Sequence, residues 1–117
     1  MLILFDNNVP RGLTRALHAH TVIESRERGW HLESRERGWH LLKNGELLTA
    51  AEDAAFDVFI TSDKNIRYQQ DLTNRKLALV VLSQGRWRLV RQRLGAIAAA
   101  VEAATPGSYT EVEIPIH

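Results

Sequence analysis

The sequence predicts a single α/β domain over residues 1–117, with a mainly parallel sheet of four to five strands and helices on both faces. Two short runs, 2–5 and 77–82, are wholly apolar, as expected of strands buried on both faces. Other apolar residues recur at helical spacing between and after these runs. Strands that alternate with helices along a chain favour a parallel sheet with both faces covered. A chain of 117 residues is long enough to bury the core of one such domain.

The first half of the chain predicts three strands and two helices. After the strand at 2–5, Pro10 suits the first turn of a helix, because proline lacks the N–H that would be unpaired there. A β-branched cluster at 21–23 predicts the second strand. Asn44 begins a helix whose apolar face includes Leu47, Leu48, Ala51 and Ala55, and 57–61 is the third strand.

The second half predicts two further strands and the longest helix. Residues 68–74 are polar and indicate a short helix or a loop, and 77–82 is the strand with the strongest signal. A stripe with spacing 3, 4, 3, 4 predicts one helix over 86–104 with a single buried face, formed by Trp87, Val90, Leu94, Ile97 and Val101. Alternation over 109–116, with Pro115 near its end, is typical of a terminal edge strand.

Composition excludes several classes of site. The chain has no cysteine, which excludes disulfides, thiolate zinc sites and cysteine nucleophiles. The first apolar run is too short for a signal peptide, and no stretch approaches the roughly 18 apolar residues of a membrane span. We therefore expect a cytoplasmic protein with no membrane partner. A net charge of +1 argues neither for nor against nucleic-acid binding. Any basic surface must therefore come from local clustering of charged residues.

An exact tandem duplication interrupts the pattern. Residues 24–32, ESRERGWHL, are repeated without change as 33–41. A nine-residue step rotates a helical pattern by about half a turn, and an odd step swaps the two faces of a strand. Trp30 and Trp39 therefore cannot enter the same core from one regular element. A bulged loop, a longer helix with an exposed tryptophan, and exchange of segments between chains are all open. We predict a homo-oligomer, most simply a dimer, with Trp30 or Trp39 at the contact.

Three acids lie where the predicted strands and helices place an active crevice. Asp6 follows the first strand, Asp63 follows the third, and Glu46 opens the helix after the duplication. Ligands of open parallel sheets bind outside the carboxyl ends of the strands. Three carboxylates in one place repel one another unless a cation such as Mg²⁺ or Mn²⁺ holds them. Singly, each acid also has a structural interpretation: a helix cap for Asp6, a dipole partner for Glu46 and a turn residue for Asp63.

Polar residues beside these acids suit a polyanionic substrate. Asn8 and Asn65 can orient water or phosphate, whereas Lys64, Arg67 and Gln70 offer charge and amides to a phosphate backbone and to bases. An ordinary solvated loop is the competing interpretation of 64–70. The densest basic run, formed by Arg86, Arg88, Arg91 and Arg93, falls mostly off the apolar stripe of its helix and is interpreted as a solvated face. The five histidines show no metal-ligand spacing.

Three segments together resemble a known family. LILFDNNVP, KNGELL and ITSDKNIRYQQDL, in this order, are similar to the PIN-like domains of unknown function, which are filed with toxins of bacterial toxin–antitoxin pairs and related to VapC-type ribonucleases. The resemblance covers nearly the whole chain apart from one copy of the duplication. It implies a three-layer PIN-like α/β fold and an acidic cluster that binds magnesium or manganese for RNA cleavage. Asp6, Glu46 and Asp63 match the acids of that cluster.

Departures from the family pattern leave the function open between alternatives. Asn7, Asn44 and Asn65 stand where relatives often carry acids, which favours a one-metal site over a two-metal site. The first hypothesis is a Mg²⁺- or Mn²⁺-dependent endoribonuclease, with an antitoxin as partner if it is a toxin. The second is a non-catalytic PIN-like module that binds RNA or a protein. The third is a variant in which the duplication drives segment exchange.

Overall fold

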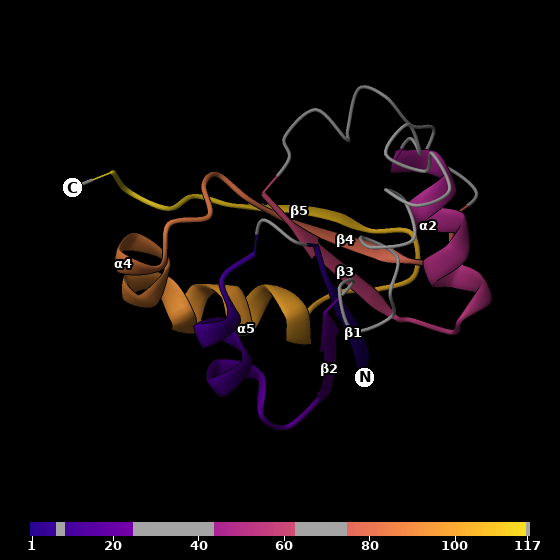
Figure 1. The fold of residues 1–117 in the computed structure, drawn as a ribbon, viewed down its shortest axis with the longest axis horizontal. Coiled ribbons are helices and arrows are strands. Elements are labelled where there is room, and N and C mark those ends of the chain that lie inside the picture. The colour runs from indigo at the N-terminus through magenta and orange to yellow at the C-terminus, as the bar shows by residue number, and fades with distance from the viewer. Residues whose placement is uncertain (7–8, 25–43, 63–74, 117) are drawn as a thin grey trace, which may run out of the picture.

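Five parallel strands form one sheet in the order β2-β1-β3-β4-β5 (Figure 1). The computed structural model describes residues 1–6, 9–24, 44–62 and 75–116, with the side chains of the second helix from Leu48 onward. The elements are β1 (Leu2–Phe5), the 3-10 helix η1 (Arg11–Leu17), β2 (Thr21–Glu24), α2 (Asn44–Asp53), β3 (Val58–Thr61), β4 (Ala78–Leu82), α4 (Trp87–Val90), the 3-10 turn η3 (Arg91–Arg93), α5 (Leu94–Glu102) and β5 (Tyr109–Val112). The predicted α/β class and parallel sheet are confirmed. Within the described ranges, no helix is long and apolar enough to cross a membrane.

The strands β3 and β4 lie inside the sheet and are buried along their length. Every residue of both strands is buried, as the apolar run 77–82 predicted for β4. Their register pairs Ile60 with Val80. On the other side of β3, Leu4 of β1 pairs with Phe59. Strands β2 and β5 form the two edges, and the chain reaches Pro115 only after β5 has ended.

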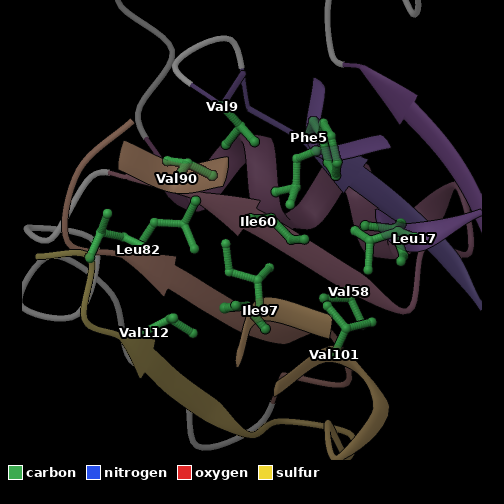
Figure 2. Close-up of a cluster of buried hydrophobic side chains, with 14 of the residues drawn as sticks. Phe5, Val9, Leu17, Val58, Ile60, Leu82, Val90, Ile97, Val101 and Val112 are labelled. Atoms are coloured by element: carbon green, nitrogen blue, oxygen red, sulfur yellow. The ribbon is translucent and has the colours of Figure 1, made fainter. Parts of the chain in front are cut away.

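Alternate side chains of these strands contribute to two separate hydrophobic clusters. The larger cluster joins one set of strand residues to η1, α4 and α5; it includes Phe5, Val58, Ile60, Leu82, Leu13, Leu17, Val90, Ile97 and Val101 (Figure 2). The smaller cluster joins the alternate set to α2; its buried members are Leu4, Phe59, Leu77, Leu79, Val81, Leu48, Ala51 and Phe56. The period-2 geometry of a strand explains why neighbouring residues belong to different clusters.

The long helix predicted over 86–104 is not continuous. The chain forms α4, then η3, then α5, and the backbone of Arg93 (φ −124°, ψ 24°) departs from helical values where α5 begins. Val90, Ile97 and Val101 of the predicted stripe are buried, but Trp87 is 39% exposed. The indole lies against the backbone of Gly12 in η1 instead of entering the core. The prediction of a single buried face was therefore wrong at its first turn.

Several predicted helices and strands begin or end at other residues than those observed. The first helix is a 3-10 helix that starts at Arg11, and the final strand stops at Val112 instead of 116. Ala55, predicted on the helix face, lies beyond α2 with a left-handed φ of 66°. The polar segment 68–74 and both copies of the duplication except Glu24 fall outside the described residues.

Ala55 completes a Schellman turn at the end of α2. The Phe56 N–H donates to the carbonyl of Ala51 and the Ala55 N–H donates to that of Glu52, both at 3.0 Å. This arrangement satisfies carbonyls at the helix end and turns Phe56 into the smaller cluster. The left-handed position is usually glycine, because a Cβ there crowds the following carbonyl.

Glu52 ties α2 to the segment before β4. Its Oε1 accepts a hydrogen bond from Arg75 Nη1 at 2.7 Å and its Oε2 accepts one from the Lys76 N–H at 3.2 Å. Arg75 Nη1 also donates to Thr49 Oγ1, one turn earlier on α2. Burial raises the pKa of Glu52, but the hydrogen bonds from Arg75 and Lys76, with the charges of those residues, outweigh it and lower the pKa overall. The ionised form is therefore favoured by folding.

We predict that Ala55→Gly raises the free energy of unfolding by about 0.5–1 kcal/mol, because glycine adopts a positive φ without the steric cost that alanine meets. Chemical denaturation measures the change. Ala54→Gly is the matched control, since Ala54 has no positive φ and should lose stability by about 0.5–1 kcal/mol from added chain entropy. Equal shifts in the two variants would contradict the role of Ala55.

We also predict a pH-dependent contribution from Glu52. A carboxyl group whose folded pKa is lowered stabilises the fold above its ordinary value of 4.5 and loses that contribution as pH falls through the folded pKa. Glu52→Gln should cost about 1 kcal/mol at pH 7, given the partial exposure of the pair. The gap between parent and variant should close as the pH is lowered below 4.5. Asp53→Asn, on the exposed neighbour, should show no such gap, and a constant gap for Glu52→Gln would refute the assignment.

Candidate functional site

The strand order creates a switch point between β1 and β3. From β1 the chain passes to β2 on one side, and the later strands β3, β4 and β5 extend on the other side. In open parallel sheets, the crevice at such a point lies outside the carboxyl ends of the two strands and is the usual ligand site. Asp6 directly follows β1, and Thr61 is the last residue of β3. These two residues therefore define the candidate site.

A hydrogen bond joins the two side chains. Thr61 Oγ1 donates to Asp6 Oδ2 at 2.7 Å. Thr61 is fully buried and is the only buried polar residue in the described ranges. A buried hydroxyl is costly unless it is hydrogen-bonded, so the pairing with the carboxylate also stabilises the end of β3. Asp6, Thr61 and the next residue, Ser62, each make further interactions.

The backbone fixes Asp6 from both sides. Its N–H donates to the carbonyl of Ile60 at 3.0 Å, which extends the pairing with β3 by one residue beyond β1. Its carbonyl accepts a hydrogen bond from the Val9 N–H, also at 3.0 Å. Val9 is buried in the larger cluster, near Val90 of α4 (Figure 2). Asp6 is thus a partly buried carboxylate whose backbone is hydrogen-bonded at both its N–H and its carbonyl, and whose side chain accepts a hydrogen bond from Thr61.

The next strand end along the sheet has a structural polar cluster. Ser83 follows β4, and its Oγ accepts a hydrogen bond from the Ile114 N–H at 2.7 Å. The Ser83 N–H donates to the carbonyl of Val112, and Gln84 Nε2 donates to that of Ile114. These bonds continue the contact between β4 and the chain after β5. None of these bonds involves an acidic side chain, so this cluster has a structural role.

The structure describes only part of the predicted acidic cluster. Asp6 lies at the carboxyl edge, as expected. Glu46 lies in the first turn of α2, but its side chain is outside the described atoms. The other predicted site and contact residues fall outside the described ranges; these are Asn8, Asp63, Lys64, Asn65, Arg67, Gln70, Trp30 and Trp39. No group of three or more His, Cys, Asp or Glu that could hold a metal ion occurs among the residues that the structure describes.

Sequence reasoning missed Thr61 as a site residue. The sequence predicts it only as the last residue of the third strand, and its β-branched side chain suits a strand. The available signal was its position as the polar residue at the carboxyl end of the predicted strand 57–61, directly before Ser62 and Asp63. A polar residue at the carboxyl end of an apolar strand points to the same edge as the acids.

The oxygen donors at this edge are of the kind that hard cations accept. A carboxylate from Asp6 lies beside the hydroxyl of Thr61, and Mg²⁺ is commonly bound by one or two carboxylates, with water and substrate phosphate filling the other positions. The described part of the site is therefore compatible with a magnesium or manganese ion.

Comparison of the chain with protein-family models, with curated proteins and with solved structures finds no match.

Proposed function

We propose that this protein is a metal-dependent ribonuclease with a PIN-like site at the carboxyl edge of its sheet. The observation that carries the proposal is the Asp6–Thr61 pair at the switch point between β1 and β3. A carboxylate held by a buried hydroxyl is directed and rigid, which is the property a metal ligand needs. The resemblance of three segments of the sequence to PIN-like domains supports the choice of RNA as substrate.

In this proposal Asp6, Glu46 and Asp63 hold one Mg²⁺ or Mn²⁺ ion. When bound, the ion supplies charge neutralisation and an activated water for cleavage of a phosphodiester. Asp6 is a ligand, and Thr61 is a positioning residue that acts through the Asp6 carboxylate. Asn8 and Asn65 orient water or phosphate, and Lys64, Arg67 and Gln70 contact the RNA. Ser62 adjoins Thr61 and Asp63, so it is positioned in the chain to continue the same polar edge.

We also propose the three-layer arrangement, with helices on both faces of the sheet. Its support is the division of the core into two clusters that take alternate strand residues. One cluster contains residues of η1, α4 and α5, whereas the other contains Leu48 and Ala51 of α2. An antitoxin partner and a homodimer with Trp30 or Trp39 at the contact complete the proposal, and both rest on the sequence alone.

We predict that Asp6→Asn lowers metal-dependent RNA cleavage at least about 100-fold, because an amide lacks the charge that holds the cation. A quenched fluorescent single-stranded RNA, with Mn²⁺ added or chelated, measures the rate. Asp53→Asn makes the same chemical change on an exposed helix end and should leave the rate unchanged. If Asp6→Asn and the parent cleave equally, the activity comes from a contaminant and the proposal fails.

We predict a smaller effect for Thr61→Val, which keeps the shape of the side chain but removes the donor to Asp6 Oδ2. Loss of a bond that orients a metal ligand typically weakens metal affinity about 10-fold to 100-fold. The Mn²⁺ concentration for half-maximal cleavage should rise by that factor, while the rate at saturating Mn²⁺ stays within about threefold. Thr61→Ser, which restores the hydroxyl, should recover most of the affinity. A Thr61→Val profile that matches the parent would remove Thr61 from the site.

A Mn²⁺ titration followed by thermal shift separates ligand binding from catalysis. Metal binding should raise the melting temperature of the parent and of Asp53→Asn, but not that of Asp6→Asn or Asp63→Asn. Binding that survives Asp63→Asn would contradict the three-acid site. RNA binding with neither cleavage nor a metal-dependent shift would identify a non-catalytic module.

A further inference from the structure

Trp87 is partly exposed, and its indole ring packs against the backbone of Gly12. A Cβ built on Gly12 would lie 2.7–2.8 Å from three atoms of the indole, so the ring rests directly on the backbone of η1. The close approach exists only because position 12 has no side chain. Trp87 is 39% exposed, whereas Leu89 and Val90, which follow it in α4, are buried. One surface of the indole is therefore fixed against η1, and a substantial part of the side chain faces solvent.

Three exposed arginines lie close to Trp87 in the sequence. Arg86 and Arg88 flank Trp87, and Arg91 lies one turn later. All three are exposed, and in the part of the chain that the structure describes none forms an ion pair. Arg11, beside Gly12, differs because its Nε lies 3.2 Å from Glu24 Oε1. We call the group of Arg86, Trp87, Arg88 and Arg91 the arginine–tryptophan face.

The arginine–tryptophan face and Asp6 both lie at the carboxyl edge of the sheet. The four-residue α4 follows β4 after a short connection, so it lies beyond the carboxyl end of that strand (Figure 1). Val90 of α4 packs in the same cluster as Val9, whose N–H bonds to the Asp6 carbonyl. One short segment, 6–12, thus joins the candidate ligand Asp6 to the glycine that supports Trp87.

We propose that the arginine–tryptophan face binds single-stranded RNA, with a base stacked on Trp87 and phosphates paired with the arginines. Base stacking on an aromatic side chain, combined with nearby cationic groups, is the usual means of binding single strands without sequence preference. Arginine matches phosphate oxygens through its planar fork of donors. The choice of RNA rests on the ribonuclease function proposed above.

The chemistry of the face favours a polyanion over a protein partner. Among described residues the large exposed hydrophobic side chains are Met1, Trp87 and Ile116, so Trp87 has no large exposed apolar neighbour within α4 or η3. The core of a protein interface usually gathers several apolar side chains and excludes charge. Here the neighbours of the ring in sequence are exposed arginines that form no ion pair with any described residue, and a phosphate backbone would neutralise their charge directly.

The first test measures stacking. A labelled 12-nucleotide oligoadenylate is titrated with the full-length Asp6→Asn protein in EDTA, and fluorescence anisotropy reports binding without cleavage. Trp87→Ala in this background should raise the Kd about tenfold, within the range expected for one stacked base. Trp87→Phe should restore binding to within about threefold. Gly12→Ala should weaken binding as Trp87→Ala does, because the new methyl group displaces the indole.

The second test measures phosphate contacts by their salt dependence. For single strands, each neutralised phosphate contributes about 0.7 to the slope of log K against log salt concentration. Arg91→Gln should reduce that slope by about 0.7, and Trp87→Ala should leave it unchanged. Lys76→Gln is the matched charge control, since this exposed lysine precedes β4 at the opposite end of the strand and should not alter the slope.

Two outcomes overturn the proposal. One is unchanged RNA affinity in a Trp87→Ala protein that keeps the melting temperature of its parent. The other is loss of self-association or of a protein complex in that variant while RNA binding is retained, which would make the face a protein interface. A duplex of equal charge should bind more weakly than the single strand; equal binding would exclude stacking. RNA binding through Trp87 in a protein that cannot cleave RNA would refute the nuclease and leave this inference standing.

Discussion

The structure depends on the need to cover two apolar faces of the same pair of strands. Every residue of β3 and β4 is buried, and alternate residues belong to different clusters. Burying a large aliphatic or aromatic side chain contributes about 1.5–3 kcal/mol, so neither face can remain in water. Parallel strands also require crossover connections, and η1, α4 and α5 contribute residues to the larger cluster whereas α2 contributes residues to the smaller one. The core and the connectivity are therefore two aspects of one constraint.

The same constraint brings the polar chemistry to one place. When all strands run in parallel, every carboxyl end lies at one edge, and the chain must leave the sheet there before it crosses back. At this edge the Asp6 N–H continues the pairing with β3 by donating to the Ile60 carbonyl, and the Asp6 carbonyl accepts a local hydrogen bond from the Val9 N–H. Thr61 connects the buried core to this edge, because it is part of the buried strand β3 and donates a hydrogen bond to the Asp6 carboxylate.

The sequence was sufficient to predict features that depend on local patterns. Wholly apolar runs located β1 and β4, and the α/β class followed from their alternation with helical segments. Strand order was beyond its reach, because β1, β3 and β4 have the same apolar character and nothing local distinguishes a neighbour. The left-handed Ala55 was missed for a related reason: alanine is a good helix former, and its conformation is set by the Schellman bonds to α2. Of the predicted site, the position of Asp6 after β1 and the place of Glu46 in the first turn of α2 can be compared with the structure.

Trp87 shows why helical spacing alone misassigns a side chain. Periodicity reports which residues share a face of a helix, but the neighbour that covers that face comes from elsewhere in the chain. For Val90 and Ile97 the neighbour is the sheet, whereas for Trp87 it is the backbone of Gly12, which leaves much of the ring in solvent. A tryptophan in this position buries only part of its surface area, so it stabilises the fold less than a tryptophan in the core would.

The position of Gly12 in the chain connects the solvent-exposed part of Trp87 with the candidate site. Asp6 and Gly12 are six residues apart, which limits the separation of their backbones to about 20 Å even for extended chain. The hydrogen bond from the Val9 N–H to the Asp6 carbonyl shortens it further. A ligand that follows the carboxyl edge from Asp6 toward α4 therefore meets the ring and its arginines within the length of a short oligonucleotide. The absence of a side chain at Gly12 allows the indole to lie against η1, so the short chain separation between Asp6 and Gly12 also limits the distance from the acid to Trp87.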